Sequence, residues 1–482
     1  MSNARTRLHD FLPDASELAL LFAARGLACV AAWQAGFRAL SDDDYARIAI
    51  AQRFAHAPSF DPTGTSWLPA PFWIYGALFR CFGTDLSVAR ATAIAGALAA
   101  TVLVYVAARL LGAAPFSALL GAAFSALLAP YSAILGIAAV PEVPCAGLML
   151  FAVATLAHRE PRLRALGGLA LSAACLSRYE AWPLALVFAL YCCWDAGRER
   201  QAALLGCAAL ALAGLGCWLA LGQQKHGDAW FFVTRVTSYR RALGGQQVSV
   251  LRRLLEYPRL ALWEGLLLWP LLLIPAFMTN KAQRQAPLAV ARALVTLSAL
   301  LAFLMLGSVR DGVPTHHAAR VLLPLWFFAS IVAGHLIGRL AHTRSAWARA
   351  VFLAAVALTA FQRGAFASAE GFAQRQLELE AGQVARRHTD RGLAIDTPDY
   401  GFFAVQAGFG APQETSVFDD HDPRHPKASP FLNAARAERA LREHEARFAI
   451  VSDAHAALLQ PRCAELWKNR DFTLLSCPSS RD

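Results

Sequence analysis

The chain has 482 residues, of which 56% are hydrophobic and only 16% are charged, and its mean hydropathy is +0.39. Soluble domains carry about a quarter charged residues, so this composition excludes an entirely soluble protein and indicates a polytopic membrane protein with a soluble remainder. The net charge of +11 does not indicate a nucleic-acid partner, because the basic residues form short clusters between apolar segments and no continuous basic face.

The predicted membrane spans begin near the N-terminus. Residues 1–14 are polar, and the apolar segment after them has no small-residue cleavage site, so we expect a retained first span and no cleaved signal peptide. A span needs about 20 apolar residues, and about eleven segments approach this length. They are residues 17–37, 86–110, 115–130, 142–157, 165–178, 181–195, 202–222, 260–279, 287–307, 319–338 and 346–362.

Small basic clusters between these segments predict the orientation of the chain. If the N-terminus is cytoplasmic, the clusters fall in cytoplasmic loops, as the positive-inside rule requires. They are Arg5/Arg7, Arg109, Arg159/Arg162/Arg164, Arg198/Arg200, Lys281/Arg284 and Arg339/Arg344/Arg349. An odd number of spans then places the C-terminal segment outside. In a Gram-negative bacterium this describes a multi-pass inner-membrane protein whose C-terminal domain faces the periplasm.

Three long polar segments are predicted on the outer side. Residues 1–362 should form an all-α membrane domain with outer loops at 38–85 and 223–259, and residues 363–482 should form a small extracytoplasmic α/β domain. Loop 223–259 interleaves aromatic residues with arginines, which predicts amphipathic helices on the membrane surface. In the tail, residues 392–396, 448–452 and 472–477 are predicted strands, and 433–447 is a predicted helix.

The ten cysteines carry little information. Most lie in apolar runs, where a thiol behaves as a small hydrophobic group, and no spacing indicates zinc. Cys463 and Cys477 fall in the polar tail. They are able to pair if the tail lies in an oxidising compartment, and the sequence leaves both states open.

An acidic run, Asp42, Asp43 and Asp44, follows the first apolar segment directly. Adjacent carboxylates repel one another, which raises at least one pKa, and such a group beside a substrate hydroxyl is a competent general base. The simpler alternative is that Ser41 and these residues cap a helix that starts at Tyr45. The two interpretations are compatible, because one carboxylate is enough to cap a helix.

Other polar residues occur at predicted outer turns. Glu142 is either a solvated turn acid or a second carboxylate that orients an acceptor or an ion. Arg178 and Glu180 form either a local ion pair or part of a phosphate site, since a guanidinium group matches phosphate oxygens. Arg320 enters a predicted span and therefore needs an anionic partner, either a carboxylate or a lipid phosphate.

Two aromatic or histidine motifs lie nearby. His316 and His317 precede Arg320, and two adjacent histidines are weak evidence for a metal site. Trp67 belongs to a Trp-Leu-Pro segment that is either an interfacial aromatic belt or a contact for the acceptor or lipid. Arg25 lies inside the first span, where it must either snorkel or pair between helices.

The order of these motifs resembles that of the polytopic GT-C class glycosyltransferases. A first span leads to acids followed by Tyr45, then to Trp67-Leu68-Pro69, then to Phe82-Gly83 and Ala89-Arg90 before the second span. The Arg178–Trp182 turn and the His316–Pro324 entry fit the same order. The sequence is most similar to bacterial protein O-mannosyltransferases and lipid A aminoarabinose transferases (family 39), over about the first ten spans.

The resemblance implies a function and assigns roles. In that family an Asp of the first outer loop is the base, which maps to Asp42 or Asp43, although the usual pair is Asp-Glu. Outer-loop arginines bind the phosphate of a polyprenyl-phosphate sugar, a role for Arg178 and Arg320, with His316 and His317 beside them. Transfer of a hexose or pentose to a lipid, glycan or protein hydroxyl is then inverting. No cofactor is expected, and a divalent cation stays possible.

Two other function classes remain as alternatives. A secondary transporter usually has charged sites near the bilayer midplane and related halves, whereas the candidates here lie at outer turns. A non-catalytic lipid-binding subunit would need none of the acids. Glu142, Glu180 and Trp67 are the acceptor-side or second-acid candidates in the enzyme interpretation.

Overall fold

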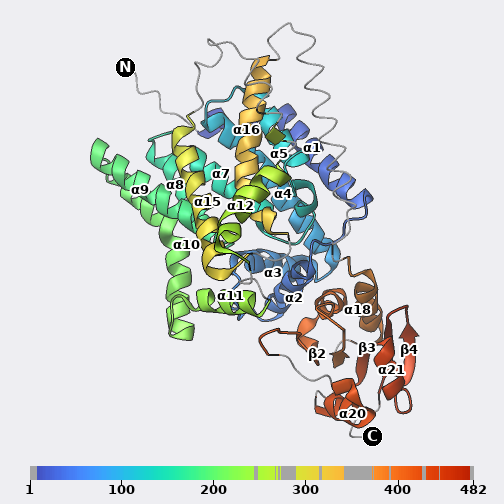
Figure 1. Cartoon of the computed structure of the whole chain (residues 1–482). Coiled ribbons are helices and arrows are strands. Elements are labelled where there is room, and N and C mark those ends of the chain that lie inside the picture. Colours follow the sequence, from blue (N-terminus) through green and yellow to red (C-terminus); the bar gives the residue numbers. More distant parts are fainter. Residues whose placement is uncertain are drawn as a thin grey trace.

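The computed structural model describes residues 8–243, 248–265, 268–269, 272, 289–313, 317–340, 372, 374–389, 392–425, 430–443 and 446–477. Figure 1 shows a body of packed helices with a small α/β domain at one end, beside α2 and α3. This is the predicted fold class, an all-α membrane domain followed by a small C-terminal α/β domain. The predicted domain boundary at residue 362 lies outside the described residues.

The helices of the larger body run in chain order. They are η1 (Leu8–Phe11), α1 (Ala15–Gln34), α2 (Asp42–His56), α3 (Ala70–Phe82), α4 (Leu86–Leu110), α5 (Pro115–Leu127), α6 (Ser132–Leu135), α7 (Glu142–Thr155), α8 (Pro161–Cys175), α9 (Ala181–Glu199), α10 (Ala203–His226), α11 (Phe231–Ala242), α12 (Val250–Glu264), α15 (Ala291–Asp311), η2 (Ala318–Leu322) and α16 (Leu323–Leu340).

Five of the described helices are long and apolar enough to cross a membrane. They are α1, α4, α10, α15 and the continuous segment Ala318–Arg339, while α5 and α7 are shorter apolar helices. The protein is therefore a multi-pass membrane protein. The predicted count of about eleven spans is not confirmed: the segments 165–178 and 181–195 fall on α8 and α9, residues 346–362 lie outside the described residues, and so does most of 260–279.

Small residues and buried polar groups hold the helices together. The helices α5 and α16 approach so closely that a Cβ atom on Gly334 would collide with the main chain of Gly121. Arg25 of α1 is fully buried and pairs between helices, with Nε donating to Thr101 Oγ1 at 2.9 Å and Nη1 donating to Ser132 O at 2.9 Å. These oxygens satisfy two of the three Arg25 nitrogens, which makes the charge tolerable inside the bundle, while Nη2 has no partner among the described residues.

The two outer loops are largely helical. Loop 38–85 contains α2 and α3, and Ser41 is the N-cap of α2, so the acidic run does start a helix, at Asp42 and not at Tyr45. Loop 223–259 contains α11 and most of α12, which confirms the predicted helices. Leu251, Leu255 and Trp263 of α12 are exposed, as suits a helix beside lipid.

The C-terminal domain contains one five-stranded sheet. Its elements are α18 (Gln376–His388), β1 (Leu393–Ile395), α19 (Phe402–Phe409), η3 (Pro412–Glu414), β2 (Thr415–Val417), η4 (Pro430–Leu432), α20 (Ala434–Glu443), β3 (Phe448–Ser452), α21 (Asp453–Leu459), β4 (Ala464–Lys468) and β5 (Phe472–Ser476). The strand order is β2-β1-β3-β5-β4, in which β2, β1 and β3 are parallel and β5 is antiparallel to β3 and β4.

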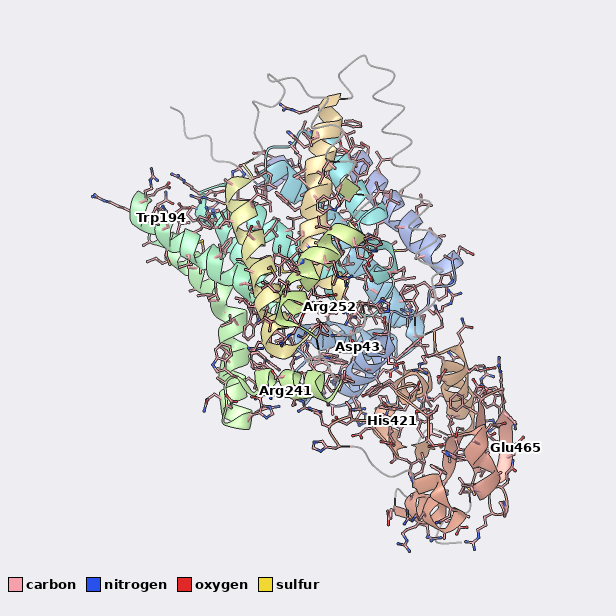
Figure 2. The ribbon with its side chains drawn as sticks, in the orientation of Figure 1. Asp43, Trp194, Arg241, Arg252, His421 and Glu465 are labelled. Atoms are coloured by element: carbon pink, nitrogen blue, oxygen red, sulfur yellow. A yellow bond between two sulfur atoms is a disulfide. The ribbon has the colours of Figure 1, made fainter. Side chains whose placement is uncertain are left out.

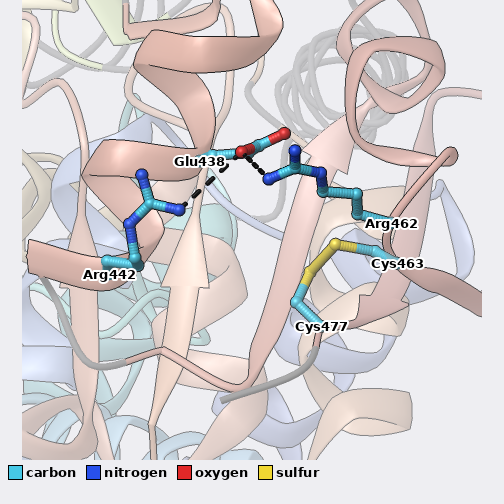
Figure 3. Close-up of a disulfide and its surroundings, with 5 residues drawn as sticks. All are labelled: Glu438, Arg442, Arg462, Cys463 and Cys477. Carbon is cyan, nitrogen blue, oxygen red and sulfur yellow. Dashed lines mark hydrogen bonds and ion pairs between the residues drawn. A yellow bond between two sulfur atoms is a disulfide. The ribbon is translucent and has the colours of Figure 1, made fainter. Parts of the chain in front are cut away.

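The tail predictions are confirmed for β1, β3, β5 and α20. Strand β2 was missed because it has only three residues, and β4 because its largely exposed residues Ala464, Glu465 and Leu466 lack an apolar pattern. A disulfide joins Cys463, just before β4, to Cys477, just after β5 (Figure 3). The bond therefore closes the β4–β5 hairpin at its open end.

Candidate active site

The acidic run lies in the first turn of α2, and its three side chains point to three different environments. Successive residues of an α-helix are rotated by about 100° from one another. Asp42, Asp43 and Asp44 therefore cannot share one site, although they are adjacent in the sequence. Figure 2 shows Asp43 at the end of the helical body that is nearer to the C-terminal domain.

Asp44 faces the protein interior. It is fully buried, and its carboxylate accepts hydrogen bonds from the main-chain N–H groups of Leu40 at 3.0 Å, Ser41 at 3.4 Å and Ala139 at 3.0 Å. Burial raises the pKa of this carboxyl group, while Arg90 and the three donors act in the opposite direction. A carboxylate with no exposed surface cannot reach an acceptor, so Asp44 fixes the loop before α2.

Asp43 faces a network of arginines and glutamates. Its Oδ2 lies 3.1 Å from Nη2 of Arg320, and Nε of Arg320 lies 3.3 Å from Oε1 of Glu142. Arg178 Nη1 donates to the same Glu142 oxygen at 2.5 Å, and Arg178 Nη2 donates to Glu180 Oε1 at 2.8 Å. The residues come from α2, α7, η2 and the turn before α9, so this network joins four segments that are far apart in the sequence.

The side chains of this network differ in their exposure to solvent, which determines which of them a ligand is able to contact. The Asp43 side chain is 40% exposed, those of Arg178 and Arg320 are 14% and 15% exposed, and that of Glu142 is 1% exposed. The interpretation of Glu142 as a solvated turn acid is therefore wrong. Asp43 is therefore the most exposed carboxylate of the network, while the buried Glu142 pairs with both arginines.

Arg47 adds a third guanidinium group, one that sequence reasoning missed. It lies one turn after Asp43 on α2, and its Cζ is 4.5 Å from the centre of the Trp67 ring. Burial lowers the pKa of Arg47, and the nearby charges of Glu142 and Asp43 oppose this effect. Its Nε has no hydrogen-bond partner among the described residues. A buried donor in this state is available to an anionic ligand.

Asp42 is occupied by a residue of the C-terminal segment. Arg375 donates to it through Nε at 2.8 Å and through Nη2 at 3.0 Å, and the same guanidinium group contacts Glu378 and Asp399. Burial alone would lower the pKa of Arg375, but its bonds to Asp42 and Asp399 raise it above the ordinary value. Sequence reasoning missed Arg375 because it is 333 residues from Asp42.

The remaining predicted residues lie around this network. Trp67 stacks with Phe72 at 6.1 Å and lies under Arg47. Its two alternatives, an interfacial aromatic belt and a contact for the acceptor or lipid, both stay predictions. The His317 ring stacks with Phe372 at 5.3 Å and meets Tyr131 edge-on at 6.1 Å. These contacts are aromatic, so phosphate binding by His317 stays a prediction. His316 lies outside the described residues.

The described part of the chain contains no group of three or more His, Cys, Asp or Glu side chains arranged to hold a metal ion. The negative groups of the site are instead paired with arginines. Three guanidinium groups, those of Arg47, Arg178 and Arg320, lie around Asp43 and Glu142. Such an arrangement is able to bind an oxyanion and to stabilise negative charge that develops on it.

The chain was compared with protein families, with curated protein sequences and with solved structures, and only solved structures match it. No model of a protein family and no curated protein sequence matches the chain. The crystal structure of ArnT from Cupriavidus metallidurans bound to undecaprenyl phosphate matches with a TM-score of 0.62 and 15% identity, over 97% of this chain and 99% of that chain. The apo state of the same protein matches with a TM-score of 0.60 and 16% identity, over 96% and 98%.

A second kind of protein matches over most of the chain. The archaeal oligosaccharyltransferase AglB from Archaeoglobus fulgidus, in complex with an inhibitory peptide and a dolichol-phosphate, has a TM-score of 0.52 and 15% identity, over 91% of this chain and 69% of that chain. At these identities the likeness concerns the fold. The helical body, its outer loop helices and the C-terminal α/β domain together show that this chain has the same fold as these structures, the GT-C fold.

Proposed function

We propose that this protein is a membrane glycosyltransferase that moves a sugar from a polyprenyl-phosphate donor to an acceptor hydroxyl group on the outer face of the membrane. The observation that carries the proposal is the open carboxylate of Asp43 beside Arg320, with Arg178 and Arg47 in the same network. A base next to a cationic cradle is what transfer from a phosphate leaving group requires.

The fold supports the class of donor. The related ArnT structure holds undecaprenyl phosphate, and the AglB structure holds a dolichol-phosphate. Both ligands are phosphates of long isoprenoid lipids, whose tails need an apolar environment while the phosphate needs cations. Here Arg320 and Glu142 lie at the first turns of the apolar helices Ala318–Arg339 and Glu142–Thr155, which supports a donor with a charged head and an apolar tail.

The mechanism is a single displacement. The acceptor oxygen attacks the anomeric carbon while Asp43 takes the proton of that hydroxyl group. The bond from the anomeric carbon to the phosphate oxygen breaks on the opposite side, and its electron pair stays on the lipid phosphate. Arg320, Arg178 and Arg47 stabilise that charge, and the sugar is transferred with inversion. The sugar is a hexose or pentose, and the acceptor is a lipid, a glycan or a protein.

The proposed location follows from the disulfide. The bond between Cys463 and Cys477 favours an oxidising compartment for the C-terminal domain. We therefore propose a periplasmic or otherwise extracytoplasmic C-terminal domain, a cytoplasmic N-terminus and insertion in the plasma membrane. Protease treatment of sealed vesicles tests this orientation, because only an outward-facing C-terminal domain is cut in right-side-out vesicles.

The test of the function is transfer of labelled sugar in liposomes. Purified protein is supplied with polyprenyl-phosphate donors of several hexoses and pentoses, and released polyprenyl phosphate is measured. Asp43→Asn should abolish release, whereas Asp471→Asn, which changes an exposed carboxylate of the C-terminal domain, should not. Release that does not depend on Asp43 would contradict the base assignment. No release from any donor by folded protein would contradict the function.

A further inference from the structure

The short segment that leads into α18 is clamped onto the acidic run. Gln374 Oε1 accepts a hydrogen bond from the main-chain N–H of Arg38 at 2.7 Å, and Gln374 O accepts one from Tyr45 Oη at 2.9 Å. These two contacts bracket the run, one before it and one after it. The next residue, Arg375, then binds Asp42 through two nitrogens.

Arg375 is held in an unusual backbone conformation. Its φ is 48° and its ψ is 37°, which is the left-handed region that side chains other than glycine rarely adopt. Such a conformation persists when the surrounding contacts determine it. Here the guanidinium group is bound by Asp42, Glu378 and Asp399 at 2.8–3.0 Å, so contacts from α2, α18 and the loop after β1 define its position.

Arg375 supplies one positive charge to three carboxylates, those of Asp42, Glu378 and Asp399. Three carboxylates share one guanidinium group, so removing that group would leave three like charges together without compensation. Asp42 would lose the partner that fixes its side chain. Asp42 and Asp43 are carried by the main chain of the same first turn of α2, so a shift of that turn after loss of the Arg375 contact moves Asp43 relative to Arg320.

We propose that Arg375 is a positioning residue for the reaction: it occupies Asp42, fixes the first turn of α2, and thereby leaves Asp43, the more exposed carboxylate, as the base beside Arg320. This inference rests on the proposed function for its catalytic part. Its structural part, the immobilisation of the α2 N-terminus by the C-terminal segment, is independent of catalysis. The C-terminal domain thus acts on the site through one side chain.

The test compares Arg375→Gln, Arg375→Lys, Asp42→Asn, Asp43→Asn and the double variant Arg375→Gln with Asp42→Asn. The matched control is Arg462→Gln, because Arg462 is also an arginine paired with a carboxylate, Glu438, but lies within the C-terminal domain (Figure 3). The first measurement is hydrogen exchange of residues 41–48 in wild type and variants. The second is transfer kinetics with the donor that wild type uses.

The expected results differ among the variants. Arg375→Gln should speed exchange at residues 41–48 and lower kcat about tenfold or more while the KM for the donor changes little, because Asp43 loses its orientation and the arginine network stays intact. Arg375→Lys should recover part of kcat. The double variant should be more active than Arg375→Gln alone, since the neutral Asn no longer repels the other two carboxylates.

Three results would overturn the proposal. One is hydrogen exchange at residues 41–48 that is as slow in Arg375→Gln as in wild type. That result would show that Arg375 does not immobilise the start of α2, whatever the catalytic result. Another is a loss from Asp42→Asn alone as large as that from Asp43→Asn, which makes Asp42 the base. The last is a double variant no better than Arg375→Gln. If wild type transfers no sugar, the proposed function fails, and the exchange measurement still decides the clamp.

Discussion

Two of the arginine–carboxylate clusters among the described residues differ in how completely they are closed. The first is the Asp43–Arg320–Glu142–Arg178 network at the outer loops. The second joins α8, α9 and α15, where Asp195 binds Arg164 Nη2 at 2.9 Å and Arg292 Nη1 and Nη2 at 2.5 and 2.9 Å. By composition alone the two clusters would be given the same role.

The Asp195 cluster is closed around its carboxylate and Arg164, although the Arg292 side chain is 25% exposed. The Arg164 side chain is 0% exposed and that of Asp195 is 1% exposed, and the remaining Arg164 donors reach the carbonyl oxygens of Thr155, Leu156 and His158. The Asp43 network is open. Its Asp43 is 40% exposed, and Glu142 Oε2 and Arg47 Nε have no hydrogen-bond partner among the described residues. This unused hydrogen-bonding capacity beside an exposed carboxylate is consistent with the donor site that we propose.

The largest expected effect breaks the open network at its base. Asp43→Asn should lower kcat by about 10²–10⁴-fold, the usual contribution of a general base, because the amide cannot accept the proton. Thermal stability should change little, since Asp43 is partly exposed. The rate of polyprenyl phosphate release measures the first effect. If Asp43→Asn keeps most of the wild-type rate, Asp43 is not the general base.

The second prediction breaks the closed cluster. Asp195→Asn should destabilise the protein by about 3–5 kcal/mol, because it leaves two arginines without their common carboxylate. Unfolding is measured as labelling by a thiol-reactive dye above the level that the exposed Cys81, Cys193 and Cys217 give in the folded protein, since Cys192 and Cys207 are buried there. The donor KM of the folded fraction should match wild type. Normal stability combined with a raised KM would mean that this cluster is functional too.

The third prediction concerns the cradle for the leaving group. Arg320→Gln should lower kcat by about 10²–10³-fold, because it removes a charged donor that is expected to stabilise the phosphate. The comparison variant is Arg442→Gln, an exposed arginine of α20 that pairs with Glu438 and should behave as wild type. A rise in KM with kcat unchanged would show that Arg320 binds the donor equally in the ground state and the transition state.

The fourth prediction is a smaller effect, on the donor KM, from changing Trp67, whose ring lies against Arg47. Trp67→Ala removes the ring face under this guanidinium group, a contact worth about 1 kcal/mol, so the donor KM should rise about five-fold. Trp67→Phe should fall between wild type and Trp67→Ala, because a phenyl ring keeps a weaker face. Equal kinetics for the two variants would indicate that Trp67 acts through packing on Phe72 and not through Arg47.

The smallest effect is expected from removal of divalent cations. We expect excess EDTA to leave the transfer rate unchanged, because three arginines are available to neutralise the leaving phosphate. Restoring Mg²⁺ or Mn²⁺ after EDTA should add nothing. A rate that falls with EDTA and returns with one of these ions would assign the acidic run to metal binding instead.

Much of the framework was predictable from the sequence. Hydropathy located the long apolar helices α1, α4, α10, α15 and Ala318–Arg339, because a membrane span must be apolar over its whole length. Short apolar runs located β1, β3 and β5, because a strand inside a sheet buries the side chains of at least one face. The composition of the acidic run and of the outer turns also named Asp43, Glu142, Arg178 and Arg320 as candidates.

Which candidates meet was decided by the tertiary structure alone. Asp42, Asp43 and Asp44 are one motif in the sequence, yet helix rotation sends them to Arg375, to Arg320 and into the buried loop. Arg47 has no distinguishing pattern within α2, and Arg375 stands 333 residues from its partner. Hydrophobic periodicity is a local property of the chain, whereas ion pairing between distant segments depends on how the helices pack.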